Sequence, residues 1–216
     1  MPLGIKINMK IKIFDNFLNN EDFKDLCCLK LEKIKKNEIK VYGNRIDKFG
    51  DIKNSIIPIN LLKKIHKNYH QKAINLLSEL NLEKVLLYDY SEFHIIETGS
   101  KYSFPIHDDT ANKLLSGVIY LSPKENLGTV FYKNRKGDGA NEIKWKPNRA
   151  VFFSRGERET WHSYAADGKS NRIALVYNLM TNNLKEVYRI EKKNFYLGFL
   201  RSRINHLLYR FFGILR

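Results

Sequence analysis

Three side chains in the middle of the chain have the types and spacing of a metal site. His107 and Asp109 form a His-x-Asp pair, and His162 follows much later in the sequence. Residues two apart in an extended segment point to the same side, so His107 and Asp109 can reach one ion while Asp108 faces away. Two imidazoles and a carboxylate leave the opposite coordination positions open, which is typical of non-haem Fe(II) sites that activate oxygen. The sequence therefore predicts Fe(II) bound by His107, Asp109 and His162.

Zinc is the competing metal for such a ligand set. A zinc hydrolase usually needs a separate general base near the bound water, and no His-Glu-x-x-His motif occurs in the chain. His66 and His70 are four residues apart in an expected helix, but Lys67 stands where such an enzyme would carry its glutamate. We therefore interpret His66 and His70 as structural, and we favour the same reading for His94.

Arg172 is the candidate for binding an anionic cosubstrate beside the iron. Asp167-Gly168, among the strongest tight-turn signals, lies between His162 and Arg172. A hairpin folded there would set His162 opposite Arg172, with Cβ atoms about 5 Å apart. 2-Oxoglutarate can chelate iron with one end, and its other carboxylate suits a bidentate arginine. The pattern thus predicts 2-oxoglutarate and O2 as cosubstrates.

The arginine's side of its strand should leave room for this cosubstrate. The residues expected to share that face are Arg172, Ala174, Val176 and Asn178. Tyr102 and Tyr120 are the leading candidates for hydroxyl groups that bind the cosubstrate carboxylates, although most buried tyrosines only pack.

The elements that must position these residues change in character along the chain. Alternating residues 9–18 predict a strand, residues 19–22 then cap a helix over 21–35, and a second helix begins near Pro58. From residue 85 onward, short runs rich in Val, Ile, Tyr and Phe are typical of strands. The expected strands span 85–96, 114–121, 129–132, 142–145, 150–153, 161–165 and 172–179. Their number and brevity predict a jelly roll.

These residues and motifs resemble the 2-oxoglutarate and Fe(II)-dependent oxygenase superfamily, in particular its prolyl-hydroxylase-like branch. Besides the four site residues, the motifs are Ile13-Phe14-Asp15-Asn16-Phe17-Leu18, Thr98-Gly99, Gly117-Val118-Ile119-Tyr120-Leu121, Gly128-Thr129 and Trp161-His162. The resemblance implies an α+β, mainly β fold: a double-stranded β-helix with N-terminal helices covering one sheet and a C-terminal amphipathic helix. Animal-type prolyl hydroxylases usually carry lysine where Arg172 stands, so the resemblance does not extend to proline as the target.

The length of 216 residues suits one sizeable domain. We expect a single oxygenase domain over 1–187, with N-terminal strand and helices in 1–84 and the jelly-roll core in 85–180, followed by an extension over 188–216. Hydrophobic residues make up 43% of the chain, which favours a globular protein. The adjacent Cys27 and Cys28 cannot easily form a disulfide with each other, and no secretory signal or run of eighteen apolar residues is found. These features favour the cytoplasm.

The extension over 188–216 has a different pattern, with apolar residues on one helical face and arginines elsewhere. It predicts a basic amphipathic helix that binds an anionic membrane surface, which would make the protein peripheral at the inner face of the membrane. The alternatives are that the apolar face docks on the domain or on a second subunit. The formal net charge of +15 is also explained by lysines scattered over a solvated surface.

The sequence thus predicts a dioxygenase that hydroxylates a substrate and converts 2-oxoglutarate into succinate and CO2. The substrate is a protein side chain, a free amino acid, or a membrane-proximal lipid or glycan intermediate. Alternatives are an oxidative demethylase of alkylated nucleic acid, the less favoured choice because no base-flipping pocket is recognised, and a non-catalytic jelly roll that binds a metal or an anion. The sequence predicts no oligomeric state.

Overall fold

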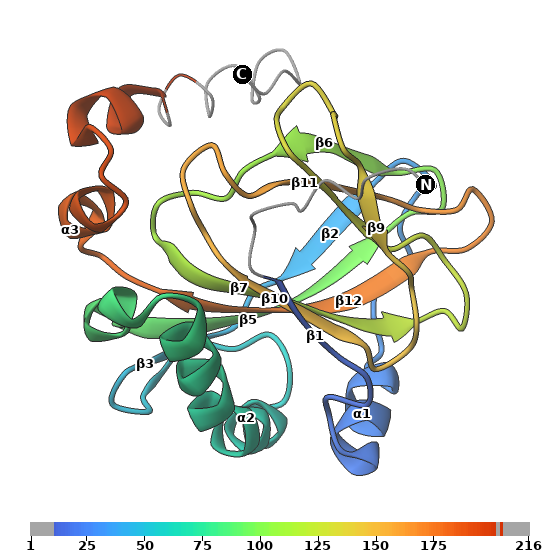
Figure 1. Ribbon diagram of the computed structural model, residues 1–216. Coiled ribbons are helices and arrows are strands. Elements are labelled where there is room, and N and C mark those ends of the chain that lie inside the picture. Colours follow the sequence, from blue (N-terminus) through green and yellow to red (C-terminus); the bar gives the residue numbers. More distant parts are fainter. Residues whose placement is uncertain (1–10, 202–203, 205–216) are drawn as a thin grey trace.

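A computed structural model describes residues 11–201 and residue 204 of the chain. The strands of the described residues form two antiparallel sheets that face each other, and the first two helices lie on the outer side of one sheet (Figure 1). The larger sheet contains β1 (Ile11–Phe14), β2 (Ile39–Tyr42), β3 (Arg45–Asp47), β4 (Ile52–Asn54), β5 (Tyr90–Thr98), β7 (Lys113–Ser122), β10 (Ala150–Ser154) and β12 (Arg172–Met180). The smaller sheet contains β6 (Ser103–His107), β8 (Thr129–Tyr132), β9 (Asn141–Ile143) and β11 (Trp161–Ala165). This arrangement confirms the predicted mainly β, two-sheet fold.

The strand order shows how distant segments come together. In the larger sheet the order is β1–β10–β7–β12–β5–β3–β4, and β2 pairs with β5 as well. In the smaller sheet the order is β6–β11–β8–β9. The predicted strands over 129–132 and 161–165 match β8 and β11, and the others from residue 114 onward differ by a few residues at their ends.

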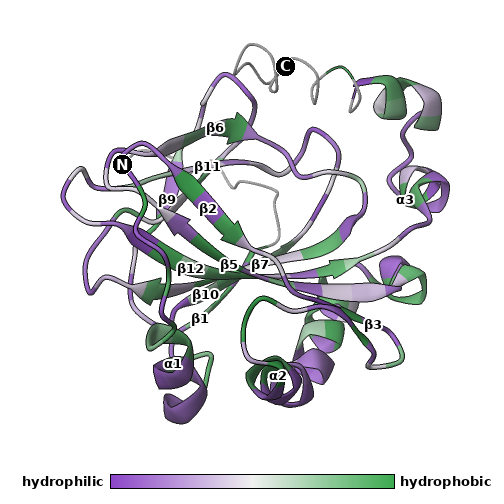
Figure 2. Ribbon diagram, turned by 180° about the vertical axis from the view of Figure 1, so that it is seen from behind, coloured by the Kyte–Doolittle hydropathy of each residue, from purple (hydrophilic) through white to green (hydrophobic). Residues whose placement is uncertain are grey.

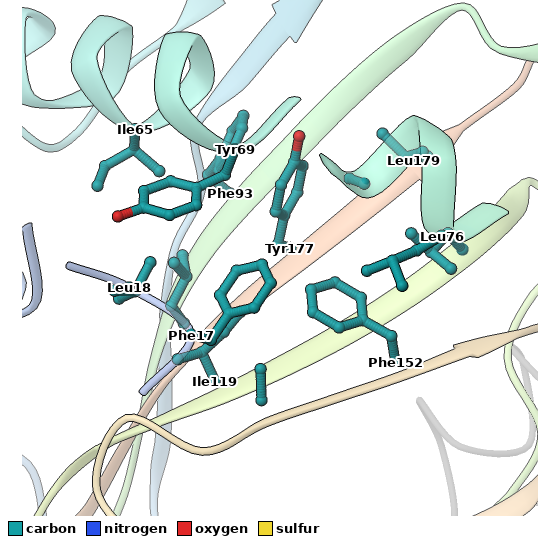
Figure 3. Packing of buried hydrophobic residues seen from close by; sticks show 14 of the residues in the cluster. Phe17, Leu18, Ile65, Tyr69, Leu76, Phe93, Ile119, Phe152, Tyr177 and Leu179 are labelled. Carbon is teal, nitrogen blue, oxygen red and sulfur yellow. The ribbon is translucent and has the colours of Figure 1, made fainter. Parts of the chain in front are cut away.

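Helices cover the outer face of the larger sheet, as predicted. These are α1 (Asn20–Cys27) and α2 (Ile59–Leu80), which contact β7 and β10 (Figure 1). Buried side chains of α2, among them Ile65, Tyr69 and Leu76, pack against Phe152 and Tyr177 of the sheet (Figure 3). Hydrophobic and hydrophilic residues both occur along α2, as expected of a helix with one buried face (Figure 2).

The strand β12 separates this helix-covered core from the space between the sheets. Leu175, Tyr177 and Leu179 belong to the core beneath the helices. The alternate residues, from Arg172 to Asn178, face the smaller sheet, because Arg172 approaches Tyr164 of β11. The predicted face of Arg172, Ala174, Val176 and Asn178 is therefore confirmed.

The helix predicted over residues 21–35 is too long, since α1 ends at Cys27. The chain beyond it is irregular, and Leu29 and Leu31 pack against the core. The backbone N–H of Glu32 donates to the hydroxyl of Tyr42. These long-range contacts outweigh the local helical preference of the segment.

The start of the strand predicted over 85–96 is also wrong. Residues Leu82–Leu87 form the 3-10 helix η1, and β5 begins at Tyr90. The turn of η1 buries Lys84 completely, and its ammonium group donates to Glu191 and to the carbonyl of Arg155. The short strands β2, β3 and β4 were not predicted, because three or four residues are too few to show a clear alternation of apolar and polar side chains.

The predicted hairpin between His162 and Arg172 does not form. Asp167 and Gly168 do make a turn, in which the Asp167 carboxylate accepts from the backbone N–H groups of Lys169 and Ser170. However, β11 pairs with β6 and β8, whereas β12 pairs with β5 and β7. The turn therefore carries the chain from one sheet to the other, and His162 and Arg172 approach the same space from opposite sheets.

The chain after β12 folds back onto the domain through α3 (Leu184–Ile190), which contains the predicted boundary at residue 188. Tyr188 is buried, and residues 195–201 and 204 are helical. Gly198 of this last helix lies against the Tyr188 ring, where an added Cβ would be 2.1 Å from the nearest ring carbon. Among the described residues, no helix is both long and apolar enough to cross a membrane.

Candidate metal and cosubstrate site

His107, Asp109 and His162 come together between the two sheets. His107 ends β6, and His162 lies directly opposite it on the neighbouring strand β11. Asp109 follows β6 by two residues, and one ligand atom from each of the three side chains lies within 4.8 Å of the others. In the part of the chain that the structure describes, this is the one such group of three His, Cys, Asp or Glu residues.

Both histidines are prepared to bind a metal through Nε2. The Nδ1 atom of His107 is 2.9 Å from the carbonyl oxygen of Pro105, and Nδ1 of His162 is 2.8 Å from that of Thr160. A carbonyl oxygen can only accept, so Nδ1 carries the proton and donates. The lone pair of each imidazole is then on Nε2, the arrangement commonly found in metal-binding histidines.

The protonation states of the three side chains suit a divalent metal. Burial and the neighbouring His162 lower the pKa of His107 to about 3. Burial also lowers the pKa of His162. Burial alone would raise the pKa of Asp109, but Lys113 and the two imidazoles outweigh it and lower this pKa below its ordinary value. Two neutral imidazoles and one carboxylate are therefore present at pH 7.

Two further side chains fix the carboxylate of Asp109. The ammonium group of Lys113 donates to Oδ1 at 2.6 Å, and the hydroxyl of Ser116 donates to Oδ2. The neighbouring Asp108 turns away, as predicted, and accepts from the backbone N–H of Arg158. The sequence reasoning missed Lys113 and Ser116. Strand alternation would have placed Ser116 on the site face, since Tyr120 is four residues further along β7.

This donor set fits Fe(II). Two imidazole nitrogens and a carboxylate oxygen come from one side, and no fourth His, Cys, Asp or Glu of the described chain joins them. Such a set leaves coordination positions open for a cosubstrate and for oxygen. A structural zinc site would normally be closed by four protein ligands.

Arg172 lies in the same space and has the environment of an anion-binding group. Its side chain is 2% exposed, and its Nε atom has no hydrogen-bond partner among the described residues. The guanidinium carbon lies 4.7 Å from the ring centre of Tyr164, 5.1 Å from Trp145 and 5.6 Å from Tyr120. No acidic residue of the described chain forms an ion pair with Arg172. Burial lowers the pKa of its guanidinium group. A buried cation without a carboxylate partner fits an anionic ligand such as 2-oxoglutarate.

The position of Tyr164 relates Arg172 to the metal ligands. Tyr164 is two residues beyond His162 on β11, on the same face of that strand. Arg172 therefore approaches β11 roughly 7 Å along the strand from His162. Tyr164 and Trp145 were not predicted as parts of the site.

The two predicted tyrosines have different environments. Tyr120 is fully buried, and its hydroxyl donates to Thr129 Oγ1 at 3.0 Å and accepts from the Thr129 N–H at 2.8 Å. Its hydroxyl thus holds β8 against β7, while its ring lines the space around Arg172. Tyr102 is half-buried between β5 and β6, with its ring centre 6.3 Å from that of Tyr164.

His66 and His70 lie on the far side of the larger sheet. Their rings stack at 4.5 Å on α2, and His66 also contacts Phe93 of β5. Both histidines are thus outside the candidate site, which agrees with their interpretation as structural.

A cavity of about 380 Å³ lies beside the loop that follows Asp109. Its lining includes Asn112 from this loop, Tyr90 from β5, Tyr188 from α3 and Phe199 from the last helix. The C-terminal helix therefore forms one wall of a cavity next to the loop that follows Asp109.

The fold is shared with solved structures of low sequence identity. A prolyl-4-hydroxylase from Pseudomonas putida is similar, with 15% identity, a TM-score of 0.54, and coverage of 81% of this chain and 94% of that chain. An oxidoreductase of the 2-oxoglutarate and Fe(II) oxygenase family from Burkholderia pseudomallei gives 11%, 0.53, 79% and 84%, respectively. A protein described as an oxygenase, from Shewanella oneidensis, gives 13%, 0.54, 92% and 91%.

Sequence comparison by itself finds no relative, since neither a family model nor a curated protein matches the chain. The likeness is therefore one of structure. The three structures cover from 79% to 92% of this chain. The chain has the fold of the 2-oxoglutarate and Fe(II)-dependent oxygenase superfamily.

Proposed function

We propose that this protein is a 2-oxoglutarate- and Fe(II)-dependent dioxygenase that hydroxylates its substrate. The proposal rests on one observation: two features lie in the same space between the sheets. One is the His107, Asp109 and His162 donor set. The other is the buried Arg172, which has no carboxylate partner among the described residues.

Different residues of the chain would bind the metal and the cosubstrate. His107, Asp109 and His162 would hold Fe(II), and the carbonyl oxygens of Pro105 and Thr160 keep both imidazoles in the required tautomer. Arg172 would bind the far carboxylate of 2-oxoglutarate, in a setting where Tyr164 and Trp145 exclude water. When bound, iron and 2-oxoglutarate supply the activation of O2 for substrate hydroxylation, with succinate and CO2 as products.

The first test measures metal and cosubstrate binding together with turnover. Purified protein mixed anaerobically with Fe(II) and 2-oxoglutarate should develop the visible absorption band of an iron-bound 2-oxo acid. Admission of O2 should then yield succinate. His107→Ala should abolish the band and the succinate, because one of three ligands is lost, whereas Asp108→Asn should keep both, because Asp108 only accepts from Arg158 N–H. Absence of the band in the unmodified protein would support a non-catalytic jelly roll instead.

The second test concerns the cosubstrate. Arg172→Met should raise the KM for 2-oxoglutarate at least tenfold, since a charge-assisted pair contributes about 1.5–3 kcal/mol. Arg149→Met is the matched control, because Arg149 pairs with Asp15 at an exposed site. An unchanged KM in Arg172→Met would remove Arg172 from the proposal.

The C-terminal extension belongs to the proposal as a segment that binds an anionic membrane surface. Tyr196, Leu197 and Leu200 are more than half exposed, and Lys192 and Lys193 precede them. The predicted apolar face continues into 205–216, which lies outside the described residues. The protein should therefore float with vesicles that contain anionic lipid and not with neutral vesicles.

A matched pair of variants separates the extension from other exposed apolar residues. Leu197→Glu combined with Leu200→Glu should abolish flotation, whereas Phe49→Glu should not, although Phe49 is 80% exposed between β3 and β4. Absence of flotation in the unmodified protein would leave docking within the protein or on a second subunit as the explanation.

A further inference from the structure

A row of polar side chains crosses the inner face of the larger sheet, beginning at the metal ligand Asp109. Ser116 of β7 donates to Asp109, and it lies directly opposite Asn178 of β12. Asn178 in turn lies opposite Glu92 of β5, and Glu92 lies opposite Arg45 of β3. Directly opposed residues of neighbouring strands share one face of the sheet. The four side chains therefore form one continuous polar row.

The neighbouring row on the Arg172 side differs in character. There, Val118 of β7 lies opposite Val176 of β12, and Val176 lies opposite His94 of β5. The next row contains Tyr120, Ala174 and Ile96. Packing between the sheets in these two rows is thus mainly apolar. Packing alone therefore gives no reason for a neighbouring row that carries an amide, a carboxylate and a guanidinium.

The hydrogen-bonding groups of the polar row are incompletely used within the described chain. Asn178 is 1% exposed, and its Oδ1 atom has no hydrogen-bond partner there. The buried Nε atom of Arg45 lacks a partner as well. Because a buried polar group without a partner is destabilising, each of these atoms points to a ligand that completes it.

Arg45 and Glu92, the two oppositely charged residues of the row, also do not pair with each other. Although Arg45 and Glu92 are direct cross-strand partners, they form no ion pair within 4 Å. The Arg45 guanidinium carbon lies 3.4 Å from the ring centre of Tyr90. Oε2 of Glu92 lies 3.6 Å from Nε2 of His94, whose pKa is lowered by burial. The Arg45 guanidinium thus packs on the Tyr90 ring and forms no ion pair with Glu92.

We propose that this row binds the substrate of the proposed oxygenase and that the substrate is a free α-amino acid. Arg45 binds its carboxylate, Glu92 binds its ammonium group, and Asn178 hydrogen-bonds a polar group on its side chain. This assignment rests on the proposed function, because the oxidised carbon must lie near the metal.

The spacing of the strands supports an amino acid over a peptide. Neighbouring strands are about 4.8 Å apart, which suits two opposite charges borne by one carbon atom. Glu92 is two strands from Ser116, so the amino acid's side chain would extend roughly 10 Å toward the metal ligands across Asn178. An internal residue of a protein has neither free charge and would leave both Arg45 and Glu92 unpaired.

Binding measurements can test this independently of turnover. Calorimetry on the metal-free protein, and on the anaerobic complex with Fe(II) and 2-oxoglutarate, should use the twenty common L-amino acids singly. For each amino acid that binds, the N-acetyl derivative removes the ammonium group and the α-amide removes the carboxylate. We expect at least one free amino acid to bind and both derivatives to bind at least tenfold more weakly.

Two outcomes would overturn the proposal: binding of no free amino acid to either form, or equal binding of a free amino acid and its N-acetyl derivative. Neither outcome would affect the iron-dependent absorption band, which tests the proposed function separately. If the band is absent but a free amino acid binds, the proposed function fails and the polar row remains an amino-acid site.

Variants test which charged residue of the row binds which charged group of the amino acid. Glu92→Gln should remove the preference for the free amino acid over its N-acetyl derivative, and Arg45→Met should remove the preference for the acid over the amide. Such selective losses would not result from general misfolding. Glu97→Gln, on the same strand but the opposite face, and Arg135→Met, exposed between β8 and β9, should keep both preferences. Retention of both preferences in Glu92→Gln and Arg45→Met would also exclude the row.

Discussion

The two histidines at the candidate metal site are oriented by the same local hydrogen bond on two strands. Each ligand histidine donates from Nδ1 to the carbonyl oxygen of the residue two positions earlier, Pro105 for His107 and Thr160 for His162. The backbone of each strand thus sets the tautomer of its own imidazole. Aromatic rings also pack against both imidazoles, Phe104 against His107 and Phe153 against His162. Asp109 differs, because its orientation depends on Lys113 and Ser116.

Removal of the Ser116 hydroxyl should weaken metal binding without unfolding the protein. Ser116→Ala takes one donor from the Asp109 carboxylate, and we expect a 10- to 100-fold loss of Fe(II) affinity, as is usual when an outer partner of a ligand is removed. Anaerobic metal titration measures this. Ser154→Ala is the control, since Ser154 donates to the carbonyl of Leu114 instead. Equal affinities of the two variants would show that Ser116 does not support the site.

At the scale of elements, the larger sheet separates two environments with different requirements. Its outer face packs under α1 and α2 through large apolar side chains such as Phe152 and Tyr177 (Figure 3). Its inner face carries Arg172 and the polar row. Side chains pack closely on the outer face. Gly117 of β7 lies beside both Phe152 and Tyr177 there.

Gly117→Ala should therefore destabilise the sheet. A Cβ at position 117 would be 2.2 Å from the Phe152 ring and 2.9 Å from the Tyr177 carbonyl oxygen. We expect a loss of about 1–3 kcal/mol in the free energy of unfolding, as for other overpacked cores. Gly43→Ala is a suitable comparison, because its Cβ would make only ordinary contacts at 3.8 Å. Denaturant titration would contradict this explanation if both variants lost the same amount.

The packing of α2 on the sheet should make stability depend on pH. Burial and the neighbouring His70 lower the pKa of His66 to about 4, and burial lowers that of His70. Since a histidine in the unfolded chain titrates near 6.5, the unfolded state binds more protons between pH 6.5 and 4. Stability should be fully present above pH 6.5 and should fall as the pH is lowered toward 4.

Urea unfolding at pH 7.5 and 5.5 measures this dependence. His66→Gln should show a smaller loss between the two pH values than the unmodified protein, because position 66 no longer titrates. His94→Gln, on the opposite face of β5, provides a comparison with another histidine whose pKa burial lowers. An undiminished loss in His66→Gln would contradict the assignment to α2.

At the scale of the whole molecule, a buried charge network joins the end of α3 to the candidate metal site. Glu191 follows α3 and accepts from Lys84 at 2.7 Å and from Arg155, and all three side chains are almost completely buried. Arg155 also donates from Nε to the backbone carbonyl of Asp109 at 3.1 Å. The C-terminal part of the domain therefore supports the loop that carries the candidate ligand Asp109.

Glu191→Ala should be strongly destabilising. It leaves Lys84 and Arg155 buried without their counter-ion, which typically costs about 3–5 kcal/mol of the free energy of unfolding. Glu186→Ala removes an ion pair with the exposed Arg189 and should cost less than about 1 kcal/mol. Denaturant unfolding of both variants measures the difference, and similar losses would show that the network contributes little.

The amino-acid sequence by itself determined the features that depend on neighbouring residues. Alternation of apolar and polar side chains located β8 and β11 at their observed bounds and assigned the inner face of β12. The His-x-Asp pair, His162 and Arg172 were predicted as metal-binding and anion-binding residues from the chemistry of their side chains, and the three predicted metal ligands do lie together in the structure. These inferences required only the period of a strand and the properties of single residues.

Only the tertiary structure decided which strands lie together. The turn at Asp167-Gly168 is local, but whether its two strands pair depends on partners far away in the sequence, β6 and β8 for β11, and β5 and β7 for β12. The same holds for the row from Ser116 to Arg45, whose members come from four strands. Cross-strand pairing is a sum of many weak long-range contacts, which local patterns do not contain.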